Sequence, residues 1–319
     1  MARVVIIGGS GHVGTYLVPR LVEAGFEVVN VSRGERTAYF PHGAWKWVRV
    51  VKLDREAEEK SGTFGAKIAE LKPDIVIDMI CFRLESARHL VEALRGRVQH
   101  FLSCGTIWVH GPSVEVPASE SQERRPFGDY GTQKAAIEAY LLDEAHRHAF
   151  PATICHPGHI VGPGWAPLNP AGHFNPNVFS TLAKGEELAL PNFGMETVHH
   201  VHADDVAQMF DRAVTRWSAS VGEAFHTVSP AALTLRGYAE GMSRWFGQEA
   251  KLKFLPWPEW KAMHSEEEAR ATWEHLYRSP NSSIEKARSL LGYEPRYTSL
   301  QAIYESVTWL IEHGVVKTR

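Results

Sequence analysis

The chain has 319 residues, with 34 lysine and arginine residues against 37 aspartate and glutamate residues, for a formal net charge of −3 at pH 7. The basic residues are scattered, so the composition gives no support for nucleic-acid binding. No apolar stretch is long enough to span a membrane, and no targeting signal precedes the first expected strand. We expect a cytoplasmic protein of one domain with a large insertion, or of two intimate lobes.

Cysteine and histidine usage argues against disulfides and against a metal. Cys81, Cys104 and Cys155 are odd in number and lie in or beside apolar strands, so we predict reduced core thiols. Several of the 17 histidines gather in segment 199–202 and invite a metal hypothesis. Successive side chains of a strand point to opposite faces, so these imidazoles diverge, and we expect no metal site.

The N-terminal segment predicts a binding site for a dinucleotide phosphate. Residues 3–7 form a β-branched run typical of a buried strand, and Gly-Gly-Ser-Gly-His-Val-Gly follows at 8–14, before a helix that stops at Gly25. The glycines let the backbone approach a pyrophosphate at the helix N-terminus and allow close packing of helix on strand. The predicted cofactor contacts here are Gly8, Ser10, Gly11, His12, Val13 and Gly14.

The end of the second predicted strand, residues 27–33, bears on cofactor choice. The acidic residue that commonly binds the ribose hydroxyls of NAD is missing, and Ser32 and Arg33 stand there instead. A guanidinium suits a 2′-phosphate, so NADP is favoured over NAD, with a solvated turn as the alternative interpretation of Arg33. A third strand over 47–53 ends at Asp54, a candidate partner for the adenine amino group.

Tyr130 and Lys134 are four residues apart on a predicted helix and therefore share one face. A cation about 4 Å from the phenol contributes roughly 4 kcal/mol at an effective dielectric constant of about 20. That energy corresponds to lowering a pKa of about 10 by roughly 3 units, which would make Tyr130 a base near neutral pH. The pair alone is a weak signal, because tyrosine and lysine are common on the solvated faces of amphipathic helices.

In combination these motifs resemble the extended short-chain dehydrogenase/reductase family, of the NAD-dependent epimerase/dehydratase type related to UDP-galactose 4-epimerase. The resemblance covers nearly the whole chain and includes the segments 101–111, 156–164, 202–207 and 281–295, in family order. It implies hydride transfer at a secondary hydroxyl or keto group of a sugar or nucleotide sugar, and a homodimer. The implied catalytic residues are Thr106, Tyr130 and Lys134.

The resemblance also implies a fold and further contacts. We expect an α/β fold, a Rossmann-type doubly wound parallel sheet with a smaller interleaved C-terminal substrate lobe. The NAD(P)-binding domain would comprise residues 1–165 and 200–229, and the substrate lobe residues 166–199 and 230–319. Further predicted cofactor contacts are Met79, Ile80, Lys134, His156 and Gly158. The predicted substrate contacts are Cys81, Trp108, His159, His173, Asn177 and Trp257.

Three departures from the family pattern affect the substrate. Segment 77–82 replaces the usual small residues and resembles an atypical subgroup that includes chloroplast stem-loop-binding proteins. Val198 stands where nucleotide-sugar enzymes usually have an arginine for the diphosphate, and Ile107 and Trp108 replace the acid pair of family dehydratases. Epimerisation is therefore favoured over dehydration. The alternatives are an NADPH-dependent ketone or aldehyde reductase, and a non-catalytic NADP-sensing or RNA-associated protein.

Overall fold

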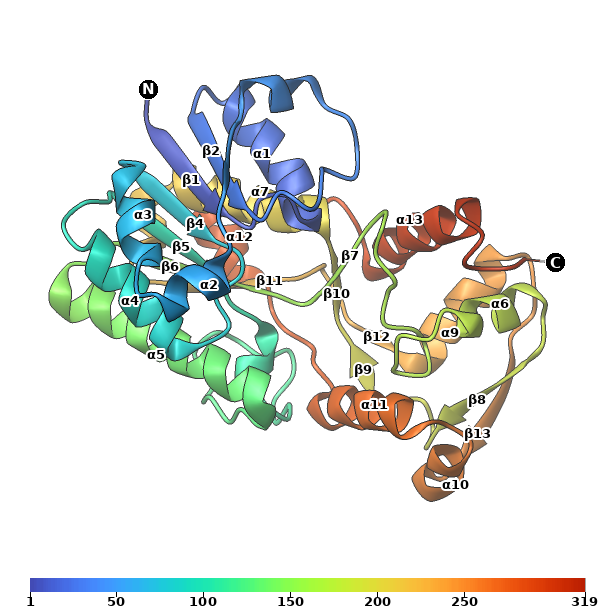
Figure 1. The fold of residues 1–319 in the computed structure, drawn as a ribbon. Coiled ribbons are helices and arrows are strands. Elements are labelled where there is room, and N and C mark those ends of the chain that lie inside the picture. The colour runs from blue at the N-terminus through green and yellow to red at the C-terminus, as the bar shows by residue number, and fades with distance from the viewer. Residues whose placement is uncertain (319) are drawn as a thin grey trace.

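The computed structural model describes residues 1–318 and is built around a seven-stranded parallel sheet (Figure 1). The strand order is β11-β6-β5-β4-β1-β2-β3. The strands of the sheet are β1 (Arg3–Ile7), β2 (Glu27–Ser32), β3 (Arg49–Lys52), β4 (Ile75–Asp78), β5 (His100–Cys104), β6 (Ala152–Pro157) and β11 (Ala224–Thr227). The predicted doubly wound α/β fold is confirmed, and its order reverses between β1 and β4, which is where such sheets bind ligands.

Alternating apolar side chains of the strands explain why helices cover both faces of the sheet. Val4 and Ile6 of β1 pack in a core with one helix layer, whereas Val5 and Ile7 pack in a separate core with the other. The first layer is α1 (His12–Glu23), α7 (Ala203–Thr215), α8 (Trp217–Ser220) and α12 (Glu285–Leu291). The second layer is α3 (Phe64–Glu70), α4 (Leu84–Leu94) and α5 (Gly128–His148), with α2 (Arg55–Lys60) beside it.

A second group of elements lies beyond the carboxyl edge of the sheet and has a core of its own (Figure 1). Its helices are α6 (Asn177–Ala183), α9 (Leu235–Trp245), α10 (Trp257–Ala262), α11 (Glu266–Arg278) and α13 (Ser299–Glu312). Its strands form pairs: β7 (His159–Val161) with β10 (His200–His202), β8 (Glu187–Pro191) with β13 (Lys251–Leu255), and β9 (Thr197–Val198) with β12 (Leu233–Thr234). Two 3-10 helices, η1 (Gly43–Trp47) and η2 (Ile107–His110), complete the chain. The division into two interleaved lobes at the boundaries given above stays a prediction.

The strand ends differ from expectation by a few residues. β3 begins at Arg49, not at residue 47, because η1 occupies Gly43–Trp47. β5 ends at Cys104, because the Thr106 side chain already caps η2. The predicted free thiols Cys81, Cys104 and Cys155 are unpaired and buried. Within residues 1–318, no helix is both long and apolar enough to cross a membrane.

Candidate active site at the carboxyl edge of the sheet

The glycine motif forms the tight turn between β1 and α1. Gly8 has a φ of 89°, a conformation that favours glycine, and a side chain at Gly14 would overlap the carbonyl oxygen of Gly9. Gly11 is different, because a Cβ there would meet only the carbonyl oxygen of Gly8 at 3.6 Å. Gly14 therefore serves helix packing, and the open space at Gly11 fits a pyrophosphate at the N-terminus of a helix with no acidic residue in its first turn.

A cavity of about 770 Å³ opens from this turn. Of the predicted cofactor contacts it is lined by Gly8, Ser10, Gly11, Ser32, Arg33, Asp54 and Ile80. Asn30, which the sequence reasoning missed, donates from its Nδ2 to Ser10 Oγ at 2.8 Å and orients that hydroxyl. The side chain of Asp54 accepts a hydrogen bond from Ala57 N at 3.2 Å and caps α2, so only part of its hydrogen-bonding capacity is free for a ligand.

Cations and carboxylates alternate around the cavity. Arg33 is exposed and pairs with Glu35 at 3.0 Å, and Arg36 lies next to it on the cavity wall. Arg55 is mostly buried, with its side chain 11% exposed, and donates to the fully buried Asp78 at 2.7 Å. Burial opposes the charge on Arg55, but the Asp78 carboxylate outweighs it and raises the pKa of Arg55 further. No sequence motif identified this pair, in which Arg55 lines the cavity and Asp78 is the last residue of β4.

The predicted catalytic residues converge at the carboxyl end of β5. Tyr130 and Lys134 occupy adjacent turns of α5, and Lys134 is buried with its Nζ donating to the Cys104 carbonyl oxygen at 2.6 Å. Thr106, also buried, follows β5, and its side chain is close enough to Tyr130 to affect the pKa of that phenol. Lys134 Nζ lies 5.8 Å from the centre of the Tyr130 ring and 4.9 Å from that of Phe82.

The expected low pKa of Tyr130 is wrong for the protein as described. Burial, followed by the effect of Cys104, raises the pKa of Tyr130 to about 12, and the Thr106 side chain opposes this only in part. Tyr130 is 41% exposed overall, so part of its side chain remains in water. The ammonium of Lys134 is held by the Cys104 carbonyl, beside the phenol and not against its oxygen.

A buried ion pair supports the Thr106 loop from behind. Glu138, one turn beyond Lys134 on α5, is gripped by Arg124 through two contacts of 2.9 and 2.6 Å. Its Oε1 lies 3.1 Å from Nε2 of His156, and Nδ1 of His156 accepts the Thr106 N–H at 2.9 Å. His156 is completely buried. This favours a role in holding the Thr106 loop over the contact with the cofactor that we predicted for it.

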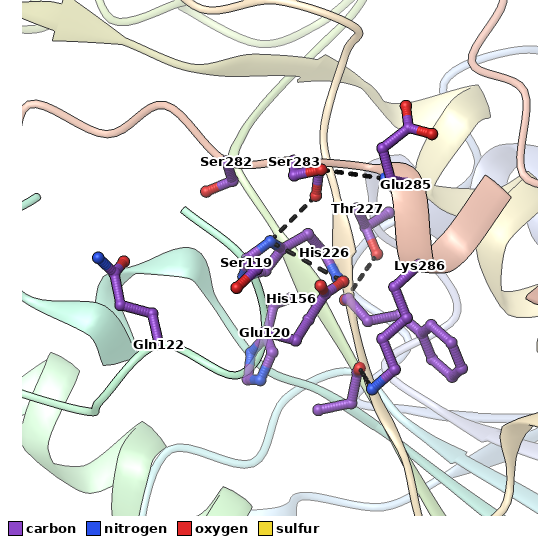
Figure 2. Close-up of polar contacts among 12 residues, drawn as sticks. Ser119, Glu120, Gln122, His156, His226, Thr227, Ser282, Ser283, Glu285 and Lys286 are labelled. Carbon is purple, nitrogen blue, oxygen red and sulfur yellow. Dashed lines mark hydrogen bonds and ion pairs between the residues drawn. The ribbon is translucent and has the colours of Figure 1, made fainter. Parts of the chain in front are cut away.

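The C-terminal motif closes this end of the sheet, as Figure 2 shows. His226 on β11 donates its backbone N–H to Glu120 at 2.8 Å, and its Nδ1 lies 3.1 Å from the Ser283 carbonyl oxygen. Lys286 on α12 donates to the Ala224 carbonyl oxygen at 2.8 Å. Segments 119–122 and 282–286 thus meet beside His156, although they lie far apart in the sequence (Figure 2).

A covering segment lies over the glycine turn. The ring of His12 stacks on Tyr39 with centroids 4.0 Å apart and lies 4.1 Å from Trp165. A side chain at Gly164 would strike the Tyr39 ring. Burial lowers the pKa of His12 to about 4, so this imidazole is neutral at physiological pH. Loop 33–47 and segment 162–165 therefore contact each other over the predicted phosphate site.

The predicted substrate residues separate into two groups. The Trp108 ring lies 5.8 Å from that of Tyr130 and 6.2 Å from that of His159, so Trp108 connects His159 to the predicted catalytic tyrosine. His173 instead contacts Asn169 at 3.1 Å and Trp260 in the core of the second group of elements. Asn177 begins α6, Trp257 packs on that same core, and Cys81 is buried.

The remaining predicted residues line the strand ends. Met79 donates its N–H to the Ile7 carbonyl oxygen at 3.0 Å, and Ile80 donates to Asp78 at 3.2 Å. A side chain at Gly158 would strike the His199 carbonyl oxygen, which explains glycine there by packing. Val13 is buried against the sheet. Within the described residues no three histidine, cysteine, aspartate or glutamate side chains are arranged to hold a metal ion.

Fold and site together define a class: a dinucleotide-binding α/β protein with a tyrosine, a lysine and a threonine at the strand ends. Residues 4–226 match the NAD dependent epimerase/dehydratase family. The protein belongs to this family of NAD(P)-dependent enzymes of the short-chain dehydrogenase/reductase type.

Individual relatives are similar over different lengths. A 2'-dehydrokanamycin reductase of Streptomyces kanamyceticus is 34% identical over 43% of this chain and 36% of its own length. A UDP-glucose 4-epimerase of Streptomyces lividans is 28% identical over 67% of this chain and 72% of its own. The structure of a UDP-glucose 4-epimerase of Thermotoga maritima with UDP-glucose superposes with a TM-score of 0.73 at 18% identity, covering 98% of this chain and 99% of that one, and shows the shared fold.

Proposed function

We propose that the protein transfers hydride at a secondary hydroxyl or keto carbon of a sugar-like substrate, with epimerisation as the leading reaction. The convergence of Tyr130, Thr106 and Lys134 beside the glycine cavity is the observation that supports this most directly. A nicotinamide cofactor, when bound, supplies hydride acceptance and return. Relatives with 4-epimerase and reductase activities support a sugar or a sugar nucleotide as the substrate.

The side chains manage the proton. Tyr130 takes the proton of the reacting hydroxyl when a ketone forms and gives it back when the alcohol is restored. Because its pKa is about 12 in the protein alone, it is protonated at neutral pH and ready to act as an acid. It becomes a better base when a positive charge is added nearby, which stabilises the phenolate. Thr106 donates to the same substrate oxygen, and Lys134, held on the Cys104 carbonyl, orients the cofactor ribose.

We further propose a preference for NADP. Arg33 and Arg36 on the cavity wall suit a 2′-phosphate, although Glu35 competes for Arg33. Arg33→Ala should weaken NADPH binding about tenfold and change NADH binding by less than about twofold, as measured by calorimetry. Arg125→Ala, which removes another exposed arginine paired to a neighbouring glutamate, is the control and should change neither. An equal loss for both cofactors in Arg33→Ala would contradict the preference.

A second candidate reaction, NADPH-dependent reduction of a ketone or aldehyde, is favoured by Val198. This side chain is completely buried where a diphosphate-binding arginine would be needed, so that position offers no cation to a nucleotide sugar. The finer assignments complete the proposal: a cytoplasmic homodimer that binds a small molecule, with no nucleic acid or membrane partner. Light scattering of the purified protein tests the dimer.

The first experiment is native mass spectrometry of the purified protein, with release and identification of any bound dinucleotide. Retained NAD or NADP supports an epimerase that recycles its cofactor. An empty protein that binds NADPH reversibly supports the reductase. Absence of binding to either cofactor, in a folded protein, would refute the proposal altogether, and retained biological activity in Tyr130→Phe would favour the non-catalytic alternative.

A further inference from the structure

Three histidines beside Trp108, of which His200 and His275 are buried and His159 is partly buried, present ring nitrogens that have no hydrogen-bond partner among the described residues. Nδ1 of His275 lies 2.6 Å from the Ala271 carbonyl oxygen, and Nε2 of His200 lies 3.1 Å from the Leu168 carbonyl oxygen. A carbonyl only accepts, so both ring nitrogens carry the proton, and the opposite nitrogens are bare acceptors. Those opposite atoms, together with Nε2 of His159, are buried and have no hydrogen-bond partner among residues 1–318.

The three imidazoles form one cluster. The ring of His159 lies 4.6 Å from that of His275 and 5.7 Å from that of His200. Burial lowers the pKa of all three, to about 4 for His275 and about 3 for His200, so the cluster is neutral at physiological pH. Its acceptors are therefore available, and an unsatisfied buried acceptor costs about 1–3 kcal/mol.

The cluster adjoins the predicted catalytic tyrosine through Trp108, whose ring lies 5.0 Å from His275 and 5.8 Å from Tyr130. Phe174 is 44% exposed and lies 6.1 Å from His159, so it forms the solvent side. These separations are those of aromatic rings in contact, so a ligand would reach the cluster from its exposed side, at Tyr130 and Phe174.

Arg278 adds a donor to this set of acceptors. Its guanidinium is buried between Trp108 and Phe127, 3.6 and 3.7 Å from the ring centres. Two of its nitrogens donate to the carbonyl oxygens of Glu274 and Phe127, but Nε has no partner within the described part of the chain. Arg278 and His275 lie three residues apart on α11, so they share a face.

The chemistry of this set selects the ligand group. A phosphate or carboxylate would be repelled by the bare lone pairs of the imidazoles, and an ammonium would be repelled by the guanidinium of Arg278. A hydroxyl both donates and accepts, so it can satisfy an imidazole nitrogen and the Nε–H of Arg278 together. Sugar rings also stack their apolar faces on aromatic side chains such as Trp108 and Phe174.

We propose that His159, His200, His275 and Arg278 form a hydroxyl-binding subsite, and that the substrate is a free polyhydroxylated ring without a nucleotide diphosphate. This inference rests on the proposed function, because the ring it describes is the one whose carbon reacts at Tyr130. It is independent of the choice between epimerisation and reduction. Buried Val198 agrees with it, since no cation replaces the missing diphosphate partner there.

The test compares neutral probes with nucleotide probes on NADP-loaded protein. The neutral set is methyl α-D-glucopyranoside, its galacto and manno isomers, and myo-inositol; the nucleotide set is UDP and UDP-glucose. Saturation-transfer NMR titrations should give at least one neutral probe a Kd on the order of 1 mM, corresponding to about 4 kcal/mol. UDP should neither bind the substrate side nor displace that probe.

Two variants then test whether His275 contributes to binding of the neutral probe. His275→Phe keeps a flat ring but removes the acceptor, so it should weaken the neutral probe about tenfold and leave NADPH binding within about twofold. The monodeoxy analogue that binds most weakly to the wild type should lose no further affinity in this variant. His313→Phe is the matched control, because His313 makes the same bond to the carbonyl four residues earlier, at 2.8 Å, but is exposed.

Any of three results overturns the inference. One is binding of UDP-glucose more than about tenfold tighter than every neutral probe, with UDP as competitor; another is equal affinity of the neutral probe for wild type and His275→Phe. Failure of all neutral probes on protein that binds NADPH overturns it as well. Failure of the proposed function would look different, because NADPH would not bind, or Tyr130→Phe would turn over substrate at the wild-type rate.

Discussion

The ion pair behind the Thr106 loop offers a sharp stability test. Arg124→Met keeps most of the side-chain volume but leaves the Glu138 carboxylate, whose side chain is 4% exposed, without its two-pronged partner. Removing one member of a buried pair costs about 3–5 kcal/mol. Because the Arg124 side chain is 25% exposed and water can enter its place, we expect the lower end, about 3 kcal/mol, in urea unfolding at pH 7.

The pKa of Glu138 determines how the stability loss of Arg124→Met changes with pH. Burial alone raises the pKa of Glu138, but His156 and Arg124 outweigh it and lower that pKa below its usual range. The wild type therefore has stability from Glu138 above the unfolded pKa of about 4.3, lost as pH falls through the lower folded pKa. In Arg124→Met the effect of burial on the Glu138 pKa dominates. The loss in the free energy of unfolding is therefore largest at pH 7 and becomes smaller as Glu138 is protonated. The difference between the two proteins should narrow between pH 7 and pH 4.

Arg125→Met is the matched control for this experiment. Arg125 is the next residue, is 61% exposed and, among residues 1–318, pairs only with the exposed Glu123, so its loss should change the free energy of unfolding by less than about 0.5 kcal/mol. A loss below about 1 kcal/mol in Arg124→Met, or a loss that stays constant from pH 7 to pH 4, would refute the reasoning.

Three further outcomes are expected. Gly14→Ala should abolish dinucleotide binding measured by calorimetry and lower the melting temperature, because its Cβ overlaps the Gly9 carbonyl, whereas Gly43→Ala, with open space around it, should change neither. Tyr130→Phe should lower the turnover number by a factor of about 10² to 10⁴ with unchanged NADPH affinity, and a smaller loss would remove Tyr130 from proton transfer. His156→Leu should lower the turnover number about tenfold without changing NADPH affinity, because the Thr106 N–H loses its acceptor; His156→Gln should restore part of that rate, and an equal loss in both variants would indicate a structural role only.

Local patterns were sufficient for the cofactor half of the protein. The β-branched run 3–7, the glycines and the helix after them predict β1, the turn and α1, because their hydrogen bonds and steric limits act within about twenty residues. The spacing of Tyr130 and Lys134 similarly predicts a shared helical face, since i and i+4 positions depend on helix geometry alone. Motif order then led to the family that residues 4–226 match.

Long-range packing decided what those side chains contact. Lys134 reaches the Cys104 carbonyl across thirty positions of sequence and leaves the Tyr130 pKa raised, which no local spacing foretells. Arg278 meets Trp108 only because the end of α11 packs against η2, far away in the sequence.

The same holds for charge and burial. Glu138 sits two helical turns after Tyr130, a signal the sequence carries, yet its partners Arg124 and His156 come from a loop and another strand. The sequence by itself determined the first strand, the glycine turn and the shared helical face of Tyr130 and Lys134, because each follows from short-range periodicity. Only the tertiary structure decided the pKa of Tyr130, the ion pair that supports the Thr106 loop and the side chains around Trp108. Desolvation and charge pairing depend on segments that meet only after folding.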